Sequence, residues 1–213
     1  MRITIERYVD AETASTLLVT HNDTFRALDD LAAEKQSLDE ELFLKLLDHP
    51  DVIMFVGWDD DGEPIALMMV TSNLGLIPWV QASFYASLYP EHAARNAIFY
   101  VPTLHVVAAH QGGPMIKALC EAFALWIVLS KGVLAFDTCK WDIDNIGVPQ
   151  FIERYALAHI DGVALEVDSQ HYFAYEAVAL KSLDLRDRTD HGIVIDLAEP
   201  TLERTGLSRV PRR

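Results

Sequence analysis

The chain has 213 residues, of which 51% are hydrophobic, and it carries a formal net charge of −15 at pH 7. This length suits one domain with or without an appendage, and this apolar content excludes an intrinsically disordered chain. The acidic balance disfavours nucleic-acid binding and favours a cationic or amine-bearing partner.

The expected compartment follows from features that the sequence lacks. No apolar run approaches the ~20 residues that a bilayer-spanning helix needs, and residues 1–6 have no hydrophobic signal-peptide core. Cys120 and Cys139 are too few for a disulfide framework and have no metal-ligand spacing. We therefore expect a cytoplasmic protein with no membrane partner and no bound metal.

The charge is unevenly distributed along the chain. Residues 1–181 hold 11 Lys and Arg against 26 Asp and Glu, whereas residues 182–213 hold 6 of each kind. The net charge therefore lies wholly in the first segment. We expect one folded domain over residues 1–181, followed by a polar C-terminal arm over residues 182–213.

Hydrophobic periodicity predicts strands alternating with amphipathic helices. Apolar residues recur at helical spacing after Asp10, and Ser37 with Glu40 forms a capping-box pattern before a second helix. Pro102 lies inside a strand-like run, which indicates a sheet edge, a bulge or a splayed strand. The expected elements are a strand at 2–9, one or two helices at 14–31, a helix between 40 and 49, a hairpin of strands at 52–58 and 65–71, an irregular, partly helical insertion at 73–97, a strand at 98–107, a helix at 114–131, a strand at 133–139, a short helix near 149, and antiparallel strands near 158–167 and 171–179.

This order predicts a mixed α/β (α+β) fold: one largely antiparallel sheet of six to seven strands, flanked by helices. Its most informative connection joins the strand at 98–107 to the long helix through a Gly112-Gly113 turn before Pro114. Flexible glycines beside a helix start leave backbone N–H groups unpaired and add a partial positive charge. We therefore expect a phosphate to bind at this corner through main-chain amides rather than lysines.

The element order, with its Gln-Gly-Gly turn before a central helix, resembles the GCN5-related N-acetyltransferase superfamily over roughly residues 1–180. In that family a strand ending in a bulge leads into an Arg/Gln-x-x-Gly-x-Gly/Ala turn, which binds the acyl-CoA pyrophosphate. With Gln111 in the first position, Pro114 and Ile116 replace the two motif glycines. A shift by one residue places Gly113 on a motif glycine and Met115 on the last small position.

The resemblance implies an acyl-CoA N-acyltransferase fold with acetyl-CoA as co-substrate. The backbone of Val106 and Val107 would hold the acyl carbonyl, although a plain β-branched strand end is the other interpretation of this pair. Lys117 would meet the cofactor phosphates and Asn145 the pantetheine arm; a solvated lysine and a helix cap are the other interpretations. The implied cofactor-binding residues are Val106, Val107, Gln111, Gly112, Gly113, Met115, Lys117 and Asn145.

Two residues are candidates for acid–base chemistry on an amine. His105 is the candidate base, because imidazole titrates near neutral pH; a hydrogen-bonded strand histidine is the other interpretation. Tyr155 is the candidate acid for the leaving thiolate, because Ile152 occupies the position of the family's tyrosine; a core-facing tyrosine is the other interpretation. Tyr100 stands where relatives often carry a glutamate, and it is interpreted as a packed aromatic residue.

The sequence therefore predicts an acyl-CoA-dependent N-acyltransferase, most simply an N-acetyltransferase, in which an amine of a small molecule or protein attacks the thioester directly. The alternative is a non-catalytic protein of the same fold that serves binding or assembly, because the motif glycines and the tyrosine are replaced. A different acyl donor or a nucleobase acceptor is a third possibility. The aromatic residues of the insertion form an acceptor-pocket wall, a homodimer contact or a local core; they are Trp79, Phe84, Tyr85 and Tyr89.

Overall fold

The structure is a computed structural model that describes residues 1–156, 161–174, 187–189 and 192–194. Its contacts divide the chain into two units, Met1–Ser169 and Gln170–Arg213. Because residues 175–186 lie outside the described part, the domain boundary expected at residue 181 stays a prediction. No helix in the described part is long and apolar enough to cross a membrane.

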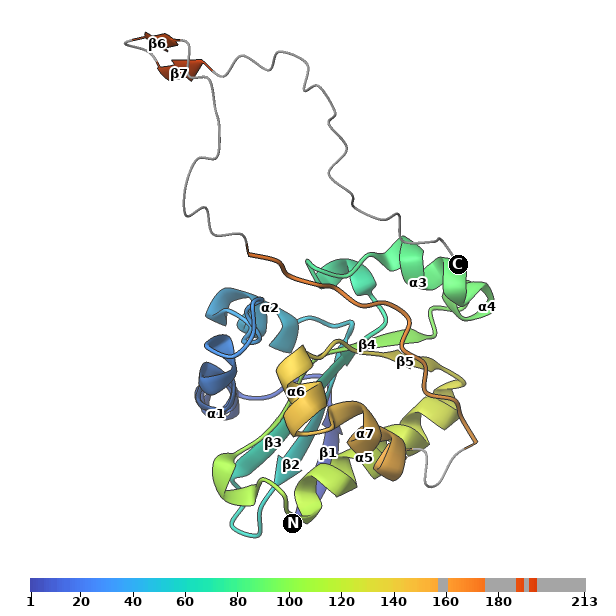
Figure 1. The fold of residues 1–213 in the computed structure, drawn as a ribbon. Coiled ribbons are helices and arrows are strands. Elements are labelled where there is room, and N and C mark those ends of the chain that lie inside the picture. The colour runs from blue at the N-terminus through green and yellow to red at the C-terminus, as the bar shows by residue number, and fades with distance from the viewer. Residues whose placement is uncertain (157–160, 175–186, 190–191, 195–213) are drawn as a thin grey trace. The chain divides into compact units, whose positions relative to one another are not determined.

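The first unit is built around one five-stranded sheet in the order β1-β2-β3-β4-β5 (Figure 1). Strands β1 to β4 run antiparallel to their neighbours, and β5 pairs in parallel with β4. The mixed α/β class is confirmed. The expected count of six to seven strands is wrong, because residues 161–167 and 171–174 form no strand. The remaining parts of that expected hairpin, 158–160 and 175–179, lie outside the described residues.

The first half of the chain follows the hydrophobic pattern closely, and its helix caps are explicit. The Asp10 carboxylate accepts the Thr13 N–H at 2.8 Å and caps one helix. Asp39 caps the next helix in place of the expected Ser37, whose hydroxyl donates to Asp29 instead. The elements are β1 (Arg2–Glu6), α1 (Ala11–Asp29), α2 (Glu40–Leu47), β2 (Val52–Trp58), β3 (Pro64–Thr71) and the 3₁₀ turn η1 (Leu74–Leu76).

The second half differs from expectation where the last strand of the sheet ends. β5 stops at Ala135, so residues 136–139, which were expected to be strand, form a loop. The insertion at 73–97 is partly helical, as the sequence predicts. The elements are α3 (Ala82–Leu88), α4 (Pro90–Ala93), β4 (Ile98–Val106), the 3₁₀ turn η2 (Ala108–His110), α5 (Pro114–Ser130), β5 (Val133–Ala135), α6 (Lys140–Asn145) and α7 (Val148–Ala156); in the second unit β6 (Asp187–Thr189) pairs with β7 (Gly192–Val194).

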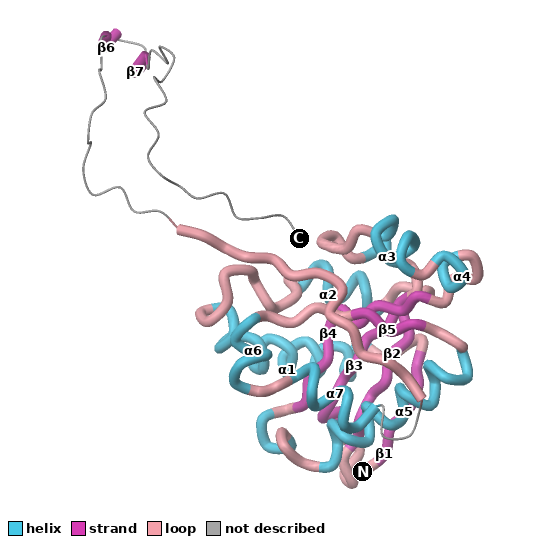
Figure 2. Tube along the Cα trace, turned by 45° about the vertical axis from the view of Figure 1, so that its right-hand side comes forward, coloured by secondary structure: helices cyan, strands magenta, loops and turns pink. Residues whose placement is uncertain are grey.

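Helices bury the sheet on both faces, which gives a three-layer arrangement (Figure 2). On one face α1 and α2 contribute Leu17 and Phe43 to a core that includes Leu67 of β3. On the other face α5 contributes Phe123, whose ring lies edge-on to that of Phe55 with centroids 5.6 Å apart. All 8 residues of β3 are buried, because this strand lies between the two layers of helices.

Two buried histidines join β4 to α1 and to the loop before α2. His21 accepts the Leu38 N–H at Nε2 (3.0 Å), so its Nδ1 carries the proton and donates to Thr103 Oγ1 (3.2 Å). His105 lies with Nε2 3.1 Å from Thr20 Oγ1, and its Nδ1 has no partner among the described residues. Burial lowers the pKa of His21 to about 4 and that of His105 to about 3. Both rings are therefore neutral in the folded protein at pH 7.

These histidines predict a specific loss of stability in mild acid. Below pH ~6.5 the histidines of the unfolded chain become protonated, whereas the buried rings of the folded protein stay neutral. The free energy of unfolding therefore decreases as the pH is lowered. His105→Leu removes one such ring. As the pH is lowered from ~6.5 to ~4.5, the stability of this variant relative to wild type therefore increases by up to about 1.4 kcal/mol per pH unit. Urea unfolding at several pH values measures the difference in stability between the variant and wild type. A difference that does not change with pH contradicts a buried, neutral His105.

Candidate functional site

The central feature of the candidate site is a bulge in the middle of β4. Val106 pairs with Ala66 and the register holds as far as Thr103, but it resumes with Tyr100 opposite Thr71. Val101 and Pro102 therefore oppose one residue of β3. The proline occupies the bulge because it has no N–H to contribute to a regular ladder. A bulge is one of the three placements that the sequence predicts for it.

At this bulge, β4 also loses its other neighbour. The parallel pairing with β5 covers only three positions and ends at Tyr100 opposite Ala135. From the bulge to Val106 the outer edge of β4 has no partner strand among residues 1–156 and 161–174. Two strands that start as a pair and then separate leave a gap bordered by unpaired backbone groups.

The orientation of the backbone shows which amides face this gap. The Val107 N–H donates to Ile65 O at 2.9 Å, so it faces β3. Backbone groups alternate along an antiparallel strand, which places those of Leu104 and Val106 on the opposite, open edge. Val106 O on that edge accepts the Gln111 side-chain amide at 3.0 Å. The Val107 N–H is thus bonded within the sheet and does not face the gap. The backbone of Val106 does face it, so the expected carbonyl-binding role stays a prediction for Val106.

The open edge of β4 leads into a corner made of η2, the glycine turn and the start of α5. Gly112 has φ +70°, and a Cβ added there would meet no atom within 4 Å. Gly113 is the N-cap of α5, no side chain caps the helix, and Pro114 occupies its first turn. The first amides of α5 consequently lack side-chain acceptors. The corner is open, polar and electropositive through its backbone alone.

Met115 and Ile116 lie against the sheet rather than in the corner. Met115 is 2% exposed, and a Cβ placed on Gly57 of β2 would lie 2.5 Å from its Sδ. Ile116 packs on the core beneath α5. Neither residue crowds the glycine turn, although both replace small residues of the family motif. Beside the helix start lies a hollow of about 260 Å³, lined by Met1, Arg2, Ile3, Pro114, Met115 and Ala118.

Four residues expected in the site have other surroundings. Lys117 Nζ lies 3.6 Å from Glu121 Oε1, one turn further along α5. Asn145 is the last residue of α6 and donates its side-chain amide to Trp141 O at 2.8 Å, so it caps no helix start. The other two are His105 and Tyr155, the candidate base and acid.

The two candidate acid–base residues have different surroundings. His105 is 3% exposed beneath α1, and its lowered pKa reflects that burial. Such a ring cannot exchange a proton with a substrate in the gap. Tyr155 lies on α7 with its ring centroid 4.6 Å from that of Phe151 on the same helix. For His105 the alternative interpretation, a hydrogen-bonded strand histidine, describes the structure better. The role of Tyr155 as an acid stays a prediction.

The cysteines are not activated nucleophiles. Burial, with the charge of Glu121 as a smaller cause, raises the pKa of Cys120 to about 11. Burial also raises the pKa of Cys139, which lies near Asp142. A thiol with a raised pKa is protonated at pH 7 and reacts slowly. A reaction at this site therefore has no cysteine that favours a covalent enzyme intermediate.

A cluster that the sequence did not predict lies where β4 and β5 separate. The Tyr100 hydroxyl donates to the Asp137 carboxylate, and Trp79 Nε1 lies 3.2 Å from both Tyr100 Oη and Asp137 Oδ1. Burial and then the charge of Asp137 raise the pKa of Tyr100. Asp137 was expected inside a strand, and only the early end of β5 brings it into this cluster. The aromatic composition of the insertion was the one available signal.

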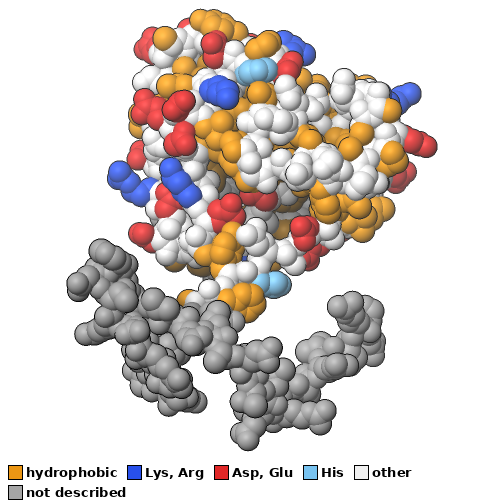
Figure 3. Space-filling view, turned by 90° about the horizontal axis from the view of Figure 1, so that it is seen from above, with side chains coloured by type: hydrophobic (Ala, Val, Ile, Leu, Met, Phe, Trp, Pro, Cys, Tyr) orange, Lys and Arg blue, Asp and Glu red, His pale blue; other side chains and the backbone are white. Residues whose placement is uncertain are grey.

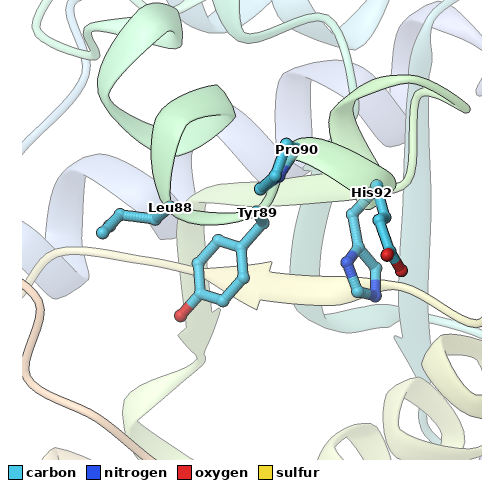
Figure 4. A pocket seen from close by; sticks show the side chains of 5 residues that line it. Leu88, Tyr89, Pro90 and His92 are labelled. Atoms are coloured by element: carbon cyan, nitrogen blue, oxygen red, sulfur yellow. The ribbon is translucent and has the colours of Figure 1, made fainter.

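A second hollow, of about 300 Å³, lies where α3 meets α4 (Figure 4). It is lined by five consecutive residues, from Leu88 to His92. Because one short stretch of chain forms all of it, this hollow is a surface notch in the insertion. It brings together no residues that are distant in the chain and is not a candidate for catalysis.

No protein-family model matches the sequence, and no curated protein is similar to it. Among solved structures, the chain is similar to aminoglycoside 6′-N-acetyltransferase AAC(6′)-Iy with a CoA bisubstrate analogue, at 10% identity and TM-score 0.49 over 83% of this chain and 100% of that one. It is similar to AAC(6′)-Ih from Acinetobacter baumannii at 10% identity and TM-score 0.48, covering 83% and 99%. It is similar to Tetrahymena GCN5 at 12% identity and TM-score 0.48, over 76% of this chain and 91% of that one. These identities transfer no residue's role to this chain.

The contact between Met115 and β2 predicts how the corner is held in place. Gly57→Val forces a side chain into the space of Met115 and Ala66, so overpacking destabilises the fold by about 1–3 kcal/mol. Urea unfolding measures this loss. Gly75→Ala is the control, because its Cβ would meet only Asn73 Oδ1 at an ordinary 3.5 Å. Equal stability of the two variants contradicts the proposed anchoring.

Proposed function

We propose that this chain is an acyl-CoA-dependent N-acyltransferase, most simply an N-acetyltransferase, with acetyl-CoA as co-substrate. The observation that carries the proposal is the continuous path from the bulge in β4, along its unpaired edge, to the open glycine corner at the start of α5. This path offers backbone N–H groups along the open edge of β4 and at the start of α5. It suits a long, anionic acyl donor whose amide groups and phosphates accept hydrogen bonds from the protein backbone or donate them to it.

Each part of the path has a distinct task in this proposal. The uncapped first amides of α5, beside Gly112, bind the pyrophosphate, because a helix start attracts anions. The N–H groups of Gln111 and Gly113 are bonded within the turn. The open edge at Leu104 and Val106 hydrogen-bonds an extended pantetheine arm as a sixth strand would. The five residues from the bulge to Val106 span about 17 Å, which suits such an arm. Gln111, bonded to Val106 O, exchanges its partner for the arm.

The acyl group would then lie at the bulge, where β4 and β5 separate. Backbone N–H groups on the open edge stabilise the negative charge that develops on the thioester oxygen. The acceptor first loses its ammonium proton to water, and the free amine attacks the carbonyl carbon to form a tetrahedral intermediate. The intermediate collapses as the C–S bond breaks, the new amide nitrogen gives a second proton to water, and the thiolate takes a proton from solvent. Since the Cys120 thiol is buried with a raised pKa, direct attack is favoured over an acyl-enzyme.

A second candidate function is a non-catalytic protein that retains this fold for binding or assembly. It is favoured by the burial of His105, which leaves the candidate base with no access to the open edge. Thermal unfolding separates the two functions. Acetyl-CoA at a hundred times its dissociation constant adds about 2.7 kcal/mol to stability. No shift at millimolar acetyl-CoA contradicts the transferase and favours the alternative.

A matched pair of substitutions at Gly112 tests the phosphate corner. Asp and Asn both tolerate the positive φ of this position and have the same size. Gly112→Asp places a carboxylate in the open corner and repels the pyrophosphate, so CoA binding weakens by roughly tenfold, about 1.4 kcal/mol, relative to Gly112→Asn.

Isothermal titration calorimetry with CoA measures both affinities, and urea unfolding checks that the two variants are equally stable. The difference shrinks as salt is added, because an exposed charge is screened. Equal CoA affinity for the two variants shows that no phosphate lies at this corner.

A further inference from the structure

The cluster around Asp137 lies beside the proposed acyl position but on no part of the donor path. Tyr100, the last residue of β4 paired with β5, donates its hydroxyl to the Asp137 carboxylate. Trp79 Nε1 adds a second donor 3.2 Å from Asp137 Oδ1. Asp137 follows Ala135, the end of β5, by two residues. A carboxylate is thus held by residues of three segments at the point where the strands separate.

The carboxylate is oriented by neutral donors and has no cationic partner. No Lys, Arg or His nitrogen lies within 4.0 Å of Asp137 in the described part of the chain. Both described donors point to Oδ1, and a carboxylate accepts about four hydrogen bonds. Its negative charge is therefore stabilised and fixed in direction, while capacity remains for a further donor from outside.

The surroundings are negative and aromatic. Tyr85 stacks edge-on to Tyr100, with ring centroids 6.2 Å apart. Burial raises the pKa of Tyr85, and the charges of Asp137 and Asp168 raise it further, so both carboxylates act on this position. Trp79 is 42% exposed, which leaves part of its ring open. Figure 3 looks onto the side of the molecule where α3 lies and shows acidic side chains interspersed with exposed hydrophobic ones.

Such surroundings distinguish between possible cations. A metal ion needs several ligands, and no group of three or more His, Cys, Asp or Glu side chains in the described residues is arranged to hold one. An organic ammonium needs one carboxylate and benefits from aromatic faces. Its carbon chain also contacts the exposed part of Trp79, which a hydrated metal ion does not.

We infer that Asp137, oriented by Tyr100 and Trp79, binds the ammonium group of the acceptor, so that the substrate class is a primary amine carried on an apolar or aromatic carbon chain. The inference rests on the proposed function for its meaning, but binding at this position does not require acetyl-CoA. Asp137 and Trp79 are specificity-determining residues. They place the amine at the separation of β4 and β5, where the proposed acyl group ends.

The test uses n-butylamine, protonated at pH 7, with n-butanol as its neutral counterpart. In ¹H–¹⁵N NMR spectra of the full chain without acetyl-CoA, n-butylamine shifts the indole N–H resonance of Trp79, which Trp79→Phe identifies. Asp137→Asn keeps an oxygen acceptor for Tyr100 and Trp79 but removes the charge, and we expect amine affinity to fall about tenfold. Asp61→Asn is the matched control, because it removes an exposed carboxylate from the β2–β3 turn.

The outcomes separate this inference from the proposed function. Binding of n-butylamine but not n-butanol, retained in Asp61→Asn and weakened in Asp137→Asn, supports the inference. No shift of the Trp79 resonance in wild type, or equal amine affinity in wild type and Asp137→Asn, overturns it. Calorimetry shows unchanged CoA affinity in Asp137→Asn if the donor corner is separate. If the wild-type protein does not bind CoA, the proposed function is overturned, whereas amine binding at Asp137 is judged from the NMR titration alone.

Discussion

β4 cannot pair regularly on both sides along its whole length, because Pro102 in its middle has no N–H. The chain accommodates the proline by bulging at Val101 and Pro102 against β3. From that point β4 has only β3 beside it, since β5 ends at Ala135. The unpaired edge, the gap beside it and the glycine corner at its far end all exist because this one strand changes its pairing halfway along.

The two ends of the gap differ in how they carry charge. At the glycine corner, positive character comes from backbone amides, because α5 begins without a side-chain cap. At the separation of the strands, negative character comes from Asp137, which two neutral donors hold in place. In the proposed function, a chain with net charge −15 thereby provides one end for an anion and the other for a cation without a cluster of lysines. Transfer from an anionic donor to an ammonium acceptor needs this polarity.

The rest of the fold fixes these ends relative to each other. Met115 holds the start of α5 on Gly57, and Phe123 packs on Phe55 of the same strand further along. On the opposite face His21 connects Thr103 of β4 to Leu38 before α2. Buried polar bonds of this kind cost stability when either ring is protonated, so the support of β4 depends on neutral histidines.

Several structural features of this protein could be predicted from the sequence because they depend on local interactions. The helix starts at Asp10 and Pro114, the hairpin of β2 and β3 and the bulge at Pro102 depend on residues that are neighbours in the chain. The open glycine turn belongs to the same group, because the positive φ of Gly112 needs no distant partner. For these features, backbone sterics and hydrogen-bonding capacity within a few residues were sufficient.

Only the tertiary structure decided which side chains serve the site. His105 and Tyr155 carry suitable groups, but α1 covers the first and Phe151 contacts the second. Asp137 was expected to be a strand residue. In the structure β5 ends before it, and Trp79, 58 positions away in the chain, donates a hydrogen bond to its carboxylate. Burial and contact between distant segments depend on how whole layers pack, and one-dimensional spacing contains no measure of that packing.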